Sequence, residues 1–186
     1  MKVAIDPGHG MSNRRRGIYD SGATHFEDGT KYEEAAIALK YGLTLKDVLR
    51  AQGHAVFMTR DDPEDHAPVG ERARNAKNAG AQVFISLHLN DFDDDTANGL
   101  EVLYRGDDDK GLAQKLQDAL IAVTNFKDRK IKKRDDLAVL KFDGVAVLIE
   151  LGFIAHDSNR AVLLNPQKRQ EMCEAIANVV LKYFEV

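Results

Sequence analysis

The amino-acid sequence predicts an α/β fold with three αβα layers, in which a mostly parallel central sheet of about six strands lies between helices. Short apolar runs, bounded by glycine, aspartate or polar turns, alternate with longer segments in which apolar residues recur at helical spacing. Strands that alternate with helices are typical of parallel sheets covered on both faces. No repeat, low-complexity tract or linker divides the 186 residues, so we expect one domain spanning residues 1–186.

Six short apolar runs are the predicted strands. In chain order they are Val3–Ile5, Ala55–Met58, Val83–Leu87, Leu100–Tyr104, Leu137–Leu140 and Val145–Ile149. Each is bounded by turn-forming or polar residues, as expected for buried strands of a covered sheet.

Three helices follow from apolar stripes. The first runs from about Tyr32 to Gln52, and Gly53 stands where a helix commonly ends in a left-handed residue. The second runs through Leu112–Val123 and the third through Met172–Tyr183, each with one buried face. The segment Gly10–Thr30 is long for a connection and rich in Gly, Arg, Asp and Ser. Because such segments in compact domains are usually functional, we predict that it forms a wall of the active site.

Composition limits the partners. The net charge of −4 and the pI near 5.9 indicate no basic face, so we expect no nucleic-acid partner. The single cysteine, Cys173, excludes an intramolecular disulfide, and we interpret it as a thiol packed on the last helix. Residues 1–6 read as a strand and not as a signal peptide or membrane span. This predicts synthesis in the cytoplasm without a signal peptide, and no membrane partner.

Ionisable side chains follow three of the predicted strands. His9 lies shortly beyond the first strand, and His88 and Glu150 each directly follow a later one. Ligands of open parallel sheets bind beyond the carboxyl ends of the strands, so these three side chains can converge on one edge. Glu34 is expected to join them from a helix, whereas its neighbour Glu33 faces solvent. Glu34 shares one helical face with four apolar residues, Ala38, Tyr41, Leu45 and Val48.

These four residues suit a metal site. Two histidines and one carboxylate with an open fourth position form the ligand set of a catalytic zinc site, and a further glutamate commonly serves as general base. His9, Glu34 and His88 can supply the ligands, and Glu150 the base. Burying these charges without a metal would be costly. We therefore predict one Zn²⁺ per chain, although a lone histidine at a strand end is more often a hydrogen-bonded structural residue.

The residues surrounding these positions carry a family resemblance. The three segments are Ile5-Asp6-Pro7-Gly8-His9-Gly10, Ser86-Leu87-His88-Leu89-Asn90 and Val147-Leu148-Ile149-Glu150-Leu151-Gly152-Phe153. Further matches are Asp20-Ser21-Gly22-Ala23, the helix start at Glu34, Met58-Thr59-Arg60 and Arg72. In this order and at these separations, they resemble the zinc-dependent N-acetylmuramoyl-L-alanine amidases of the Amidase_3 type over nearly the whole chain.

The resemblance implies zinc ligands at His9, Glu34 and His88, with Glu150 as catalytic acid and base. It implies peptidoglycan as the substrate, cut by zinc-activated water at the amide bond between N-acetylmuramic acid and the L-alanine of the stem peptide. Ser21 stands where the family often has Pro, and the pair 155–156 is Ala-His in place of the common Ser-Asn. These departures bear on substrate detail and leave the reaction unchanged, because none falls on a proposed ligand.

The long segment Gly10–Thr30, which contains Met11-Ser12-Asn13-Arg14, is similar to that of phage and prophage lytic members. Together with the missing export signal and the lack of a separate wall-binding domain, it favours a compact, bacteriolytic endolysin over a secreted cell-division amidase. We expect a monomeric catalytic domain that reaches the cell wall through host lysis machinery or another route not encoded in the chain.

Other polar clusters are predicted to be solvated. The four remaining histidines are interpreted as loop or surface residues; they are His25, His54, His66 and His156. The acidic cluster Asp91, Asp93, Asp94, Asp95 lacks the glycine and glutamate spacing of a calcium loop. The basic run within 127–134 could contact anionic wall polymers, but aspartates dilute it and a solvated face is preferred.

Three alternatives stay open at this stage. The turn Asp6-Pro7-Gly8-His9-Gly10 could cradle a phosphate, although it lacks the glycine patterns of nucleotide-binding loops. A zinc exopeptidase acting on free peptides would use the same metal, water and glutamate. A catalytically inactive wall-binding module could retain the fold, although nothing structural would then require all four site residues.

Overall fold

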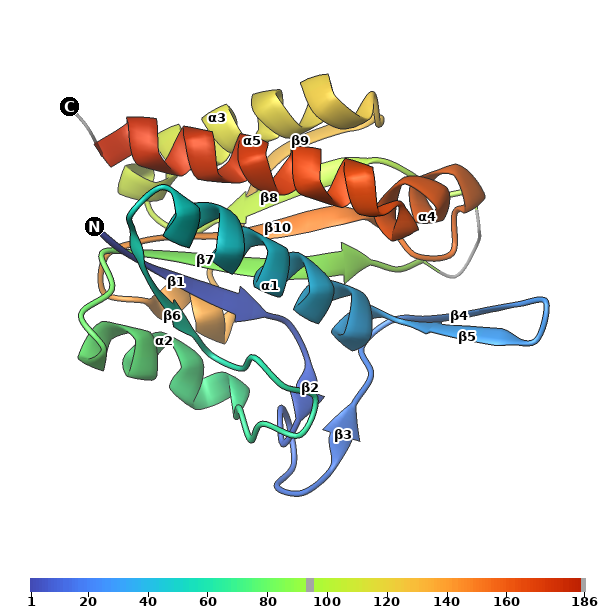
Figure 1. Ribbon diagram of the computed structural model, residues 1–186, viewed down its shortest axis with the longest axis horizontal. Helices are drawn as coiled ribbons and strands as arrows, with labels where there is room; N and C mark the ends of the chain where they lie inside the picture. The colour runs from blue at the N-terminus through green and yellow to red at the C-terminus, as the bar shows by residue number, and fades with distance from the viewer. Residues whose placement is uncertain (93–95, 185–186) are drawn as a thin grey trace.

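A six-stranded sheet forms the centre of the computed structural model, which describes residues 1–92 and 96–184. In spatial order its strands are β6 (Ala55–Met58), β1 (Lys2–Pro7), β7 (Val83–Asn90), β10 (Val145–Phe153), β8 (Leu100–Tyr104) and β9 (Asp128–Lys133). The first four are parallel, β8 is antiparallel to β10, and β9 is parallel to β8. The predicted mostly parallel sheet of about six strands is confirmed (Figure 1).

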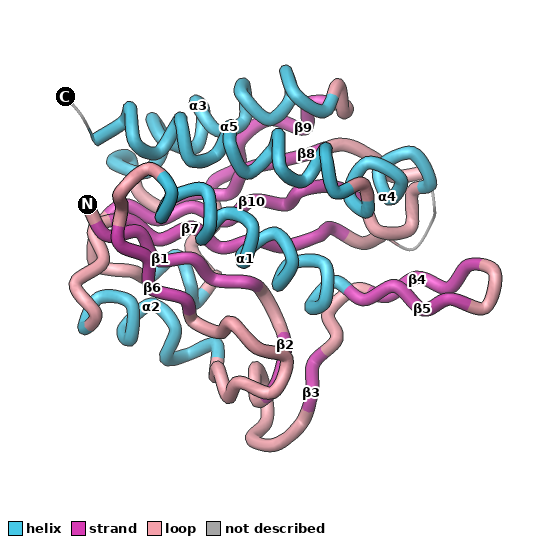
Figure 2. Tube along the Cα trace, viewed as in Figure 1, coloured by secondary structure: helices cyan, strands magenta, loops and turns pink. Residues whose placement is uncertain are grey.

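Helices cover both faces of this sheet (Figures 1 and 2). One face is covered by α1 (Glu34–Ala51), α3 (Asp107–Thr124) and α5 (Pro166–Phe184). The opposite face carries α2 (Val69–Asn78) and the short 3₁₀ helix η1 (Ala138–Lys141), while α4 (Asp157–Leu164) links β10 to α5. The three-layer αβα prediction is therefore correct. None of the helices in the described ranges is both long and apolar enough to cross a bilayer.

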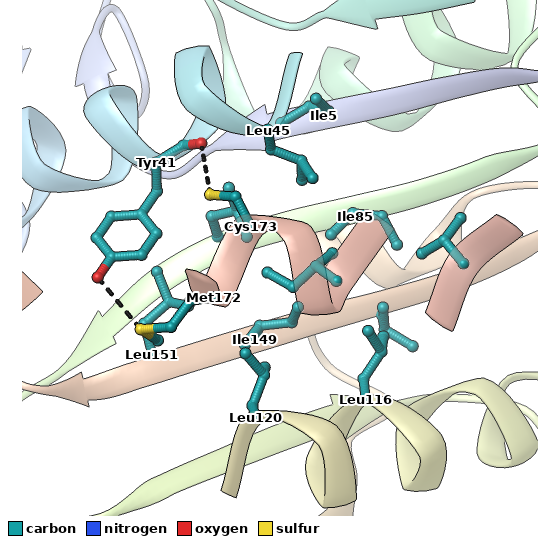
Figure 3. Close-up of a cluster of buried hydrophobic side chains, with 14 of the residues drawn as sticks. Ile5, Tyr41, Leu45, Ile85, Leu116, Leu120, Ile149, Leu151, Met172 and Cys173 are labelled. Carbon is teal, nitrogen blue, oxygen red and sulfur yellow. Dashed lines mark hydrogen bonds between the residues drawn. The ribbon is translucent and has the colours of Figure 1, made fainter. Parts of the chain in front are cut away.

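Side chains of the central strands alternate between two apolar cores, as strand geometry requires. On β7, Ile85 and its odd-numbered neighbours point into the larger core under α1, α3 and α5, whereas Phe84 points into the smaller core near α2. Figure 3 shows Tyr41 of α1 meeting α5 in the larger core, where its hydroxyl donates to Met172 Sδ at 3.4 Å and its carbonyl accepts from Cys173 Sγ at 3.5 Å. Burial raises the pKa of the Cys173 thiol to about 12. The interpretation of Cys173 as a packed thiol is confirmed.

One predicted strand was wrong. The apolar run Leu137–Leu140 lies mostly in the 3₁₀ helix η1, whose Val139 and Leu140 pack into the smaller core. The sixth strand is instead β9, Asp128–Lys133, taken from the sequence as a solvated basic run. β9 is an edge strand with a single partner, β8. Ile131 is its one apolar residue, so it has little of the apolar pattern that predicts a strand.

The segment Gly10–Thr30 contains more regular structure than the sequence indicates. Two short strands, β2 (Gly10–Met11) and β3 (Tyr19–Asp20), pair with each other. The strands β4 (Thr24–Glu27) and β5 (Thr30–Glu33) form a hairpin that projects from the body beside the start of α1 (Figure 1).

The helices α2 and α4 were not predicted, since α2 buries only Arg72 and Ala76 and has almost no apolar stripe.

Candidate metal centre

Three of the predicted site residues meet at the carboxyl end of the parallel strands. His9 follows β1, His88 lies near the end of β7, and Glu34 is the first residue of α1. His9 Nε2 is 3.1 Å from Glu34 Oε2, and His88 Nδ1 is 2.8 Å from Glu34 Oε1. Ligand atoms from all three residues lie within 4.8 Å of one another. The structure therefore brings the predicted ligand set together from positions up to 79 residues apart in sequence.

Glu34 is the buried centre of this group, with 3% of its surface exposed. The backbone N–H groups of Ala23 and Leu89 donate to its two carboxylate oxygens, at 2.8 and 3.0 Å. Burial by itself would raise the pKa of Glu34, but hydrogen bonds from His88 and His9 outweigh it and hold the pKa well below its ordinary value. The carboxylate is thus charged and aimed at both imidazoles. The prediction that Glu34 faces inward is confirmed.

The start of α1 also organises the segment before it. The first N–H groups of a helix have no partner within the helix. Here Glu34 N donates to Ala23 O at 2.9 Å, and Ala35 N donates to Ser21 O at 3.0 Å. These bonds hold residues 21–23 against the helix start, beside the Glu34 carboxylate.

Two buried arginines hold the backbone around His9. Arg72 donates to His9 O at 2.7 Å and to Pro7 O at 3.0 Å. Arg60 donates to Pro7 O at 3.0 Å and to Gly8 O at 2.8 Å. Arg72 also pairs with the fully buried Asp6 at 2.8 Å. Burial by itself would raise the pKa of Asp6, but the Arg72 charge and two hydroxyl donors keep it below its ordinary value. The turn that carries His9 is therefore fixed by charged groups beneath it.

Asp20 orients the His9 ring. Its Oδ2 atom lies 3.1 Å from His9 Nδ1, and because a carboxylate can only accept, the Nδ1–H donates. With Nδ1 bonded to Asp20, Nε2 is the ring nitrogen that faces Glu34 and could bind a metal ion. A carboxylate behind a ligating histidine is a recurrent arrangement in metal sites. The sequence analysis quoted Asp20 as part of a family-like segment but assigned it no role. Its position in that segment was the available signal, and only the fold shows that it contacts His9.

The site has no room for side chains at two glycines. A Cβ on Gly8 would lie 2.3 Å from the His88 ring. A Cβ on Gly22 would lie 2.5 Å from Glu34 Oε2 and 2.7 Å from the His9 ring, and Gly22 also has a positive φ of 65°. The main chain thus packs directly against the candidate ligands, which limits their movement.

Glu150 lies on the strand next to His88. The two residues are Cα partners in the β10–β7 pairing. Within the described chain, Glu150 Oε2 is buried and has no hydrogen-bond partner. Burial raises the pKa of Glu150 to about 7; the Glu34 and Glu101 charges add to this, and His88 opposes it. An unpartnered buried carboxyl with a pKa near neutrality is suited to accepting and returning a proton.

The donor set fits a divalent metal that takes nitrogen and oxygen ligands. Two imidazole nitrogens and a carboxylate, backed by Asp20, match the three protein ligands of catalytic zinc sites. The unpartnered oxygen of Glu150 lies on the strand beside them. The residues present therefore fit a zinc ion with one open position.

The other polar clusters stay apart from this centre. Among the remaining histidines, His66 contacts Ser12, His156 accepts from Asn159 N at the start of α4, and none joins the candidate ligands among the described residues. Of the acidic cluster, Asp93, Asp94 and Asp95 lie outside the described residues, and Asp91 is exposed. In the basic run, Arg129 and Lys132 are not simply solvated, because both pair with the buried carboxylate of Glu101, at 2.7 and 2.6 Å.

Comparison with known proteins shows which family the chain resembles in sequence. A family model described as N-acetylmuramoyl-L-alanine amidase matches residues 3–182. The germination-specific N-acetylmuramoyl-L-alanine amidase of Bacillus subtilis is 27% identical, over 98% of this chain and 79% of that protein. The probable cell wall amidase LytH of Staphylococcus aureus is 30% identical, over 98% of this chain but only 58% of that protein.

A solved structure agrees with these matches. The catalytic domain of CwlV, an N-acetylmuramoyl-L-alanine amidase from Bacillus (Paenibacillus) polymyxa, superimposes with a TM-score of 0.88 at 26% identity. The match covers 100% of this chain and 98% of that domain. With a family match over nearly its whole length and the fold of a catalytic domain from that family, the chain belongs to the N-acetylmuramoyl-L-alanine amidases of the Amidase_3 type.

Proposed function

We propose that this protein is a zinc-dependent N-acetylmuramoyl-L-alanine amidase that hydrolyses the amide bond between N-acetylmuramic acid and the L-alanine of the peptidoglycan stem peptide. The observation that carries the proposal is the convergence of ligand atoms of His9, Glu34 and His88 within 4.8 Å, beside Glu150, whose Oε2 atom is buried without a hydrogen-bond partner among the described residues. Family membership supplies the substrate class.

His9, Glu34 and His88 would hold the metal, through the nitrogen and oxygen atoms that already face one another. When bound, Zn²⁺ supplies Lewis acidity, which brings the pKa of water toward neutrality and polarises a carbonyl oxygen. Asp20 keeps the His9 proton on Nδ1, so that Nε2 stays available as a metal ligand. Arg72 and Arg60 prevent the His9 turn from moving away.

Glu150 would move the proton. As a carboxylate it accepts a proton from the attacking water, and as the acid it returns that proton to the amide nitrogen, which leaves as the amine of L-alanine. The C–N bond breaks, and the lactyl group becomes a carboxylate. A pKa of about 7 lets Glu150 serve in both forms near neutral pH.

The remaining features of the function are also proposals. We infer one zinc ion per chain, a monomer whose catalytic domain spans residues 1–186, and action at the cell wall. The endolysin subtype stays a prediction from the Gly10–Thr30 segment, since the two relatives compared above are named as a germination-specific amidase and a probable cell wall amidase.

Glu150→Gln and His88→Ala separate catalysis from metal binding. Glu150→Gln should lower kcat on purified sacculi by about 10²- to 10⁴-fold, because it removes the proton carrier, and should retain zinc. His88→Ala should lose the zinc itself, because it removes a ligand. Metal analysis of each purified variant, with mass analysis of the fragments released with and without a chelator, measures both effects. Near-normal digestion by Glu150→Gln would contradict the assignment.

Two alternatives give different products in the same assay. A zinc exopeptidase would release amino acids from free peptides and leave the muramoyl–alanine bond intact. A catalytically inactive binding module would adsorb to sacculi without releasing new amino termini. Identification of free L-alanine amino termini on released stem peptides distinguishes the amidase from both.

A further inference from the structure

A turn at residues 12–17 presents three consecutive arginines next to the metal centre. Ser12 and Asn13 anchor this turn, with 3% and 7% of their surfaces exposed. Ser12 Oγ accepts from Gly17 N at 2.8 Å, and Ser12 N donates to Ile18 O at 2.9 Å. The anchored turn leaves all three arginines, residues 14–16, exposed at its tip.

Two adjoining hollows run from the metal centre past this turn. The inner hollow, of about 220 Å³, is lined by His9 and His88 and has a mostly apolar wall that includes Leu148. The outer hollow, of about 610 Å³, lies between the turn and the start of α2, and Arg16 lines it. Both hollows are lined by Asn13, Arg14 and Val69, so they lie next to each other, and the inner one reaches the candidate ligands. We refer to the two hollows together as the groove.

The outer half of this groove has excess positive charge. Arg14 pairs with Asp20 at 3.2 Å, but 76% of its side chain is exposed. No ion pair of Arg16 is found among residues 1–92 and 96–184, and its side chain is exposed. The one acid in the lining, Glu71, lies 3.5 Å from Arg74 on the same helix. An incoming carboxylate would therefore meet an exposed guanidinium with little competition.

We propose that this groove binds the stem peptide, and that Arg16, with Arg14, recognises a peptide carboxylate. The inference rests on the proposed amidase function. On one side of the scissile bond the substrate carries N-acetylated sugars without charge; on the other it carries a peptide that ends in a carboxylate. Only the peptide side matches a basic groove. The apolar wall next to His9 and His88 suits the small side chain of alanine, and guanidinium groups bind carboxylates with paired hydrogen bonds.

Charge removal at the turn tests the proposal on soluble disaccharide-peptides. One substrate keeps its peptide carboxylates, and the other carries carboxamides in their place. The variants are Arg16→Ala, Arg16→Lys, and the matched control Arg15→Ala, which removes a neighbouring exposed arginine that lines neither hollow. The zinc content and melting temperature of each variant are measured alongside kcat and KM.

We expect Arg16→Ala to raise KM for the carboxylate substrate about tenfold and to leave kcat nearly unchanged, because the contact lies away from the reacting bond. Arg16→Lys should raise KM less than Arg16→Ala does, since it keeps the positive charge but lacks the planar guanidinium group. The carboxamide substrate should show a high KM with the unmodified protein and no further increase with Arg16→Ala. Arg15→Ala should match the unmodified protein on both substrates.

Different failures can be told apart. If the unmodified protein opens the muramoyl–alanine bond in neither substrate, the amidase function itself is wrong. If it cleaves both with the same KM and Arg16→Ala changes neither, the amidase function stands and the groove assignment is wrong. If Arg16→Ala weakens adsorption to phosphate-rich sacculi while kinetics on soluble substrates stay unchanged, the turn binds an anionic wall polymer, which also overturns the proposal.

Discussion

His9 has a backbone φ of 61°, in the left-handed region that residues other than glycine seldom occupy. Such a conformation costs on the order of 1–3 kcal/mol and persists where the surroundings hold it. Here the surroundings are charged, since Arg72 donates to the His9 carbonyl from beneath and Asp20 accepts from its ring. The strained backbone and the ring orientation together aim Nε2 at Glu34.

Asp20→Asn tests the orienting role of this carboxylate. Replacing a partner behind a ligating histidine typically weakens metal affinity by about 10- to 100-fold, and we expect a loss in that range. Competition with a chromophoric zinc chelator gives the affinity. The matched control is Asp28→Asn, at an exposed hairpin turn with φ 47°, a conformation that Asn tolerates. Equal zinc affinities for the two variants would show that Asp20 does not support zinc binding by His9.

Glu150 links the site to pH through its raised pKa of about 7. In the unfolded chain this carboxyl loses its proton near pH 4.5, whereas in the folded, metal-free protein it keeps the proton until about pH 7. Between these values the folded state binds more protons than the unfolded state, so the contribution of Glu150 to the free energy of unfolding falls as pH rises.

Glu150→Gln should remove this pH dependence. Relative to the variant, metal-free wild-type protein should lose stability on the order of 2 kcal/mol as the pH rises from 4.5 to 7. Urea unfolding of both proteins in chelator, across that pH range, measures the difference. Parallel stability curves would show that Glu150 does not titrate near neutrality in the folded chain.

At the scale of elements, the approach of α1 to the sheet positions Glu34 at the site. Gly42 is buried in the middle of α1, and a Cβ there would lie 2.6 Å from Pro7 Cγ on β1. The absence of a side chain therefore lets α1 pack directly over the strand that leads to His9. The spacing between α1 and β1 also determines the distance between two of the candidate ligands.

Gly42→Ala should cost about 1–3 kcal/mol of stability through this overlap, although alanine normally favours a helix. It should also weaken zinc binding, since α1 carries Glu34. The control is Gly70→Ala in α2, where an added Cβ meets nothing within 4 Å and a gain of about 0.5 kcal/mol is expected. Denaturant unfolding compares the two variants, and a neutral or stabilising Gly42→Ala would contradict the packing argument.

At the scale of the whole molecule, the candidate ligands come from three separate elements. His9 follows β1, Glu34 begins α1, and His88 lies in β7, so the set exists only when the sheet and its covering helix have assembled. An ion that binds the folded state and not the unfolded chain stabilises the fold. Metal binding at these three residues would therefore be coupled to folding of the domain.

Zinc should raise the melting temperature of the chelator-treated protein in a concentration-dependent way. At 100 times its Kd, Zn²⁺ would add about 2.7 kcal/mol, which corresponds to roughly 5–10 °C for a domain of this size. Differential scanning calorimetry with Zn²⁺ and with Mg²⁺ measures the shift. Glu34→Gln should abolish it. An equal shift in that variant would place the stabilising ion elsewhere.

The sequence alone determined the layer architecture and the candidate ligands. Apolar runs and helical stripes reflect burial that repeats every few residues, so local pattern was sufficient for β1, β7, β10 and the helices α1, α3 and α5. The helical phase of Glu34 and the strand-end positions of His9 and His88 depend on the same local geometry. Their convergence followed from one general rule, that the carboxyl ends of parallel strands share an edge.

Only the tertiary structure decided the rest. The edge strand β9 carries almost no apolar signal because one side of it has no partner strand, and the run at Leu137 is apolar because it covers the opposite face of the sheet. The contact of Asp20 with His9 depends on the pairing of β2 with β3, and the raised pKa of Glu150 depends on burial and on charges carried by other elements. Electrostatics and side-chain hydrogen bonds depend on distances in space, and the periodicity of a sequence indicates which sheet edge a residue reaches but not which side chains lie within bonding distance there.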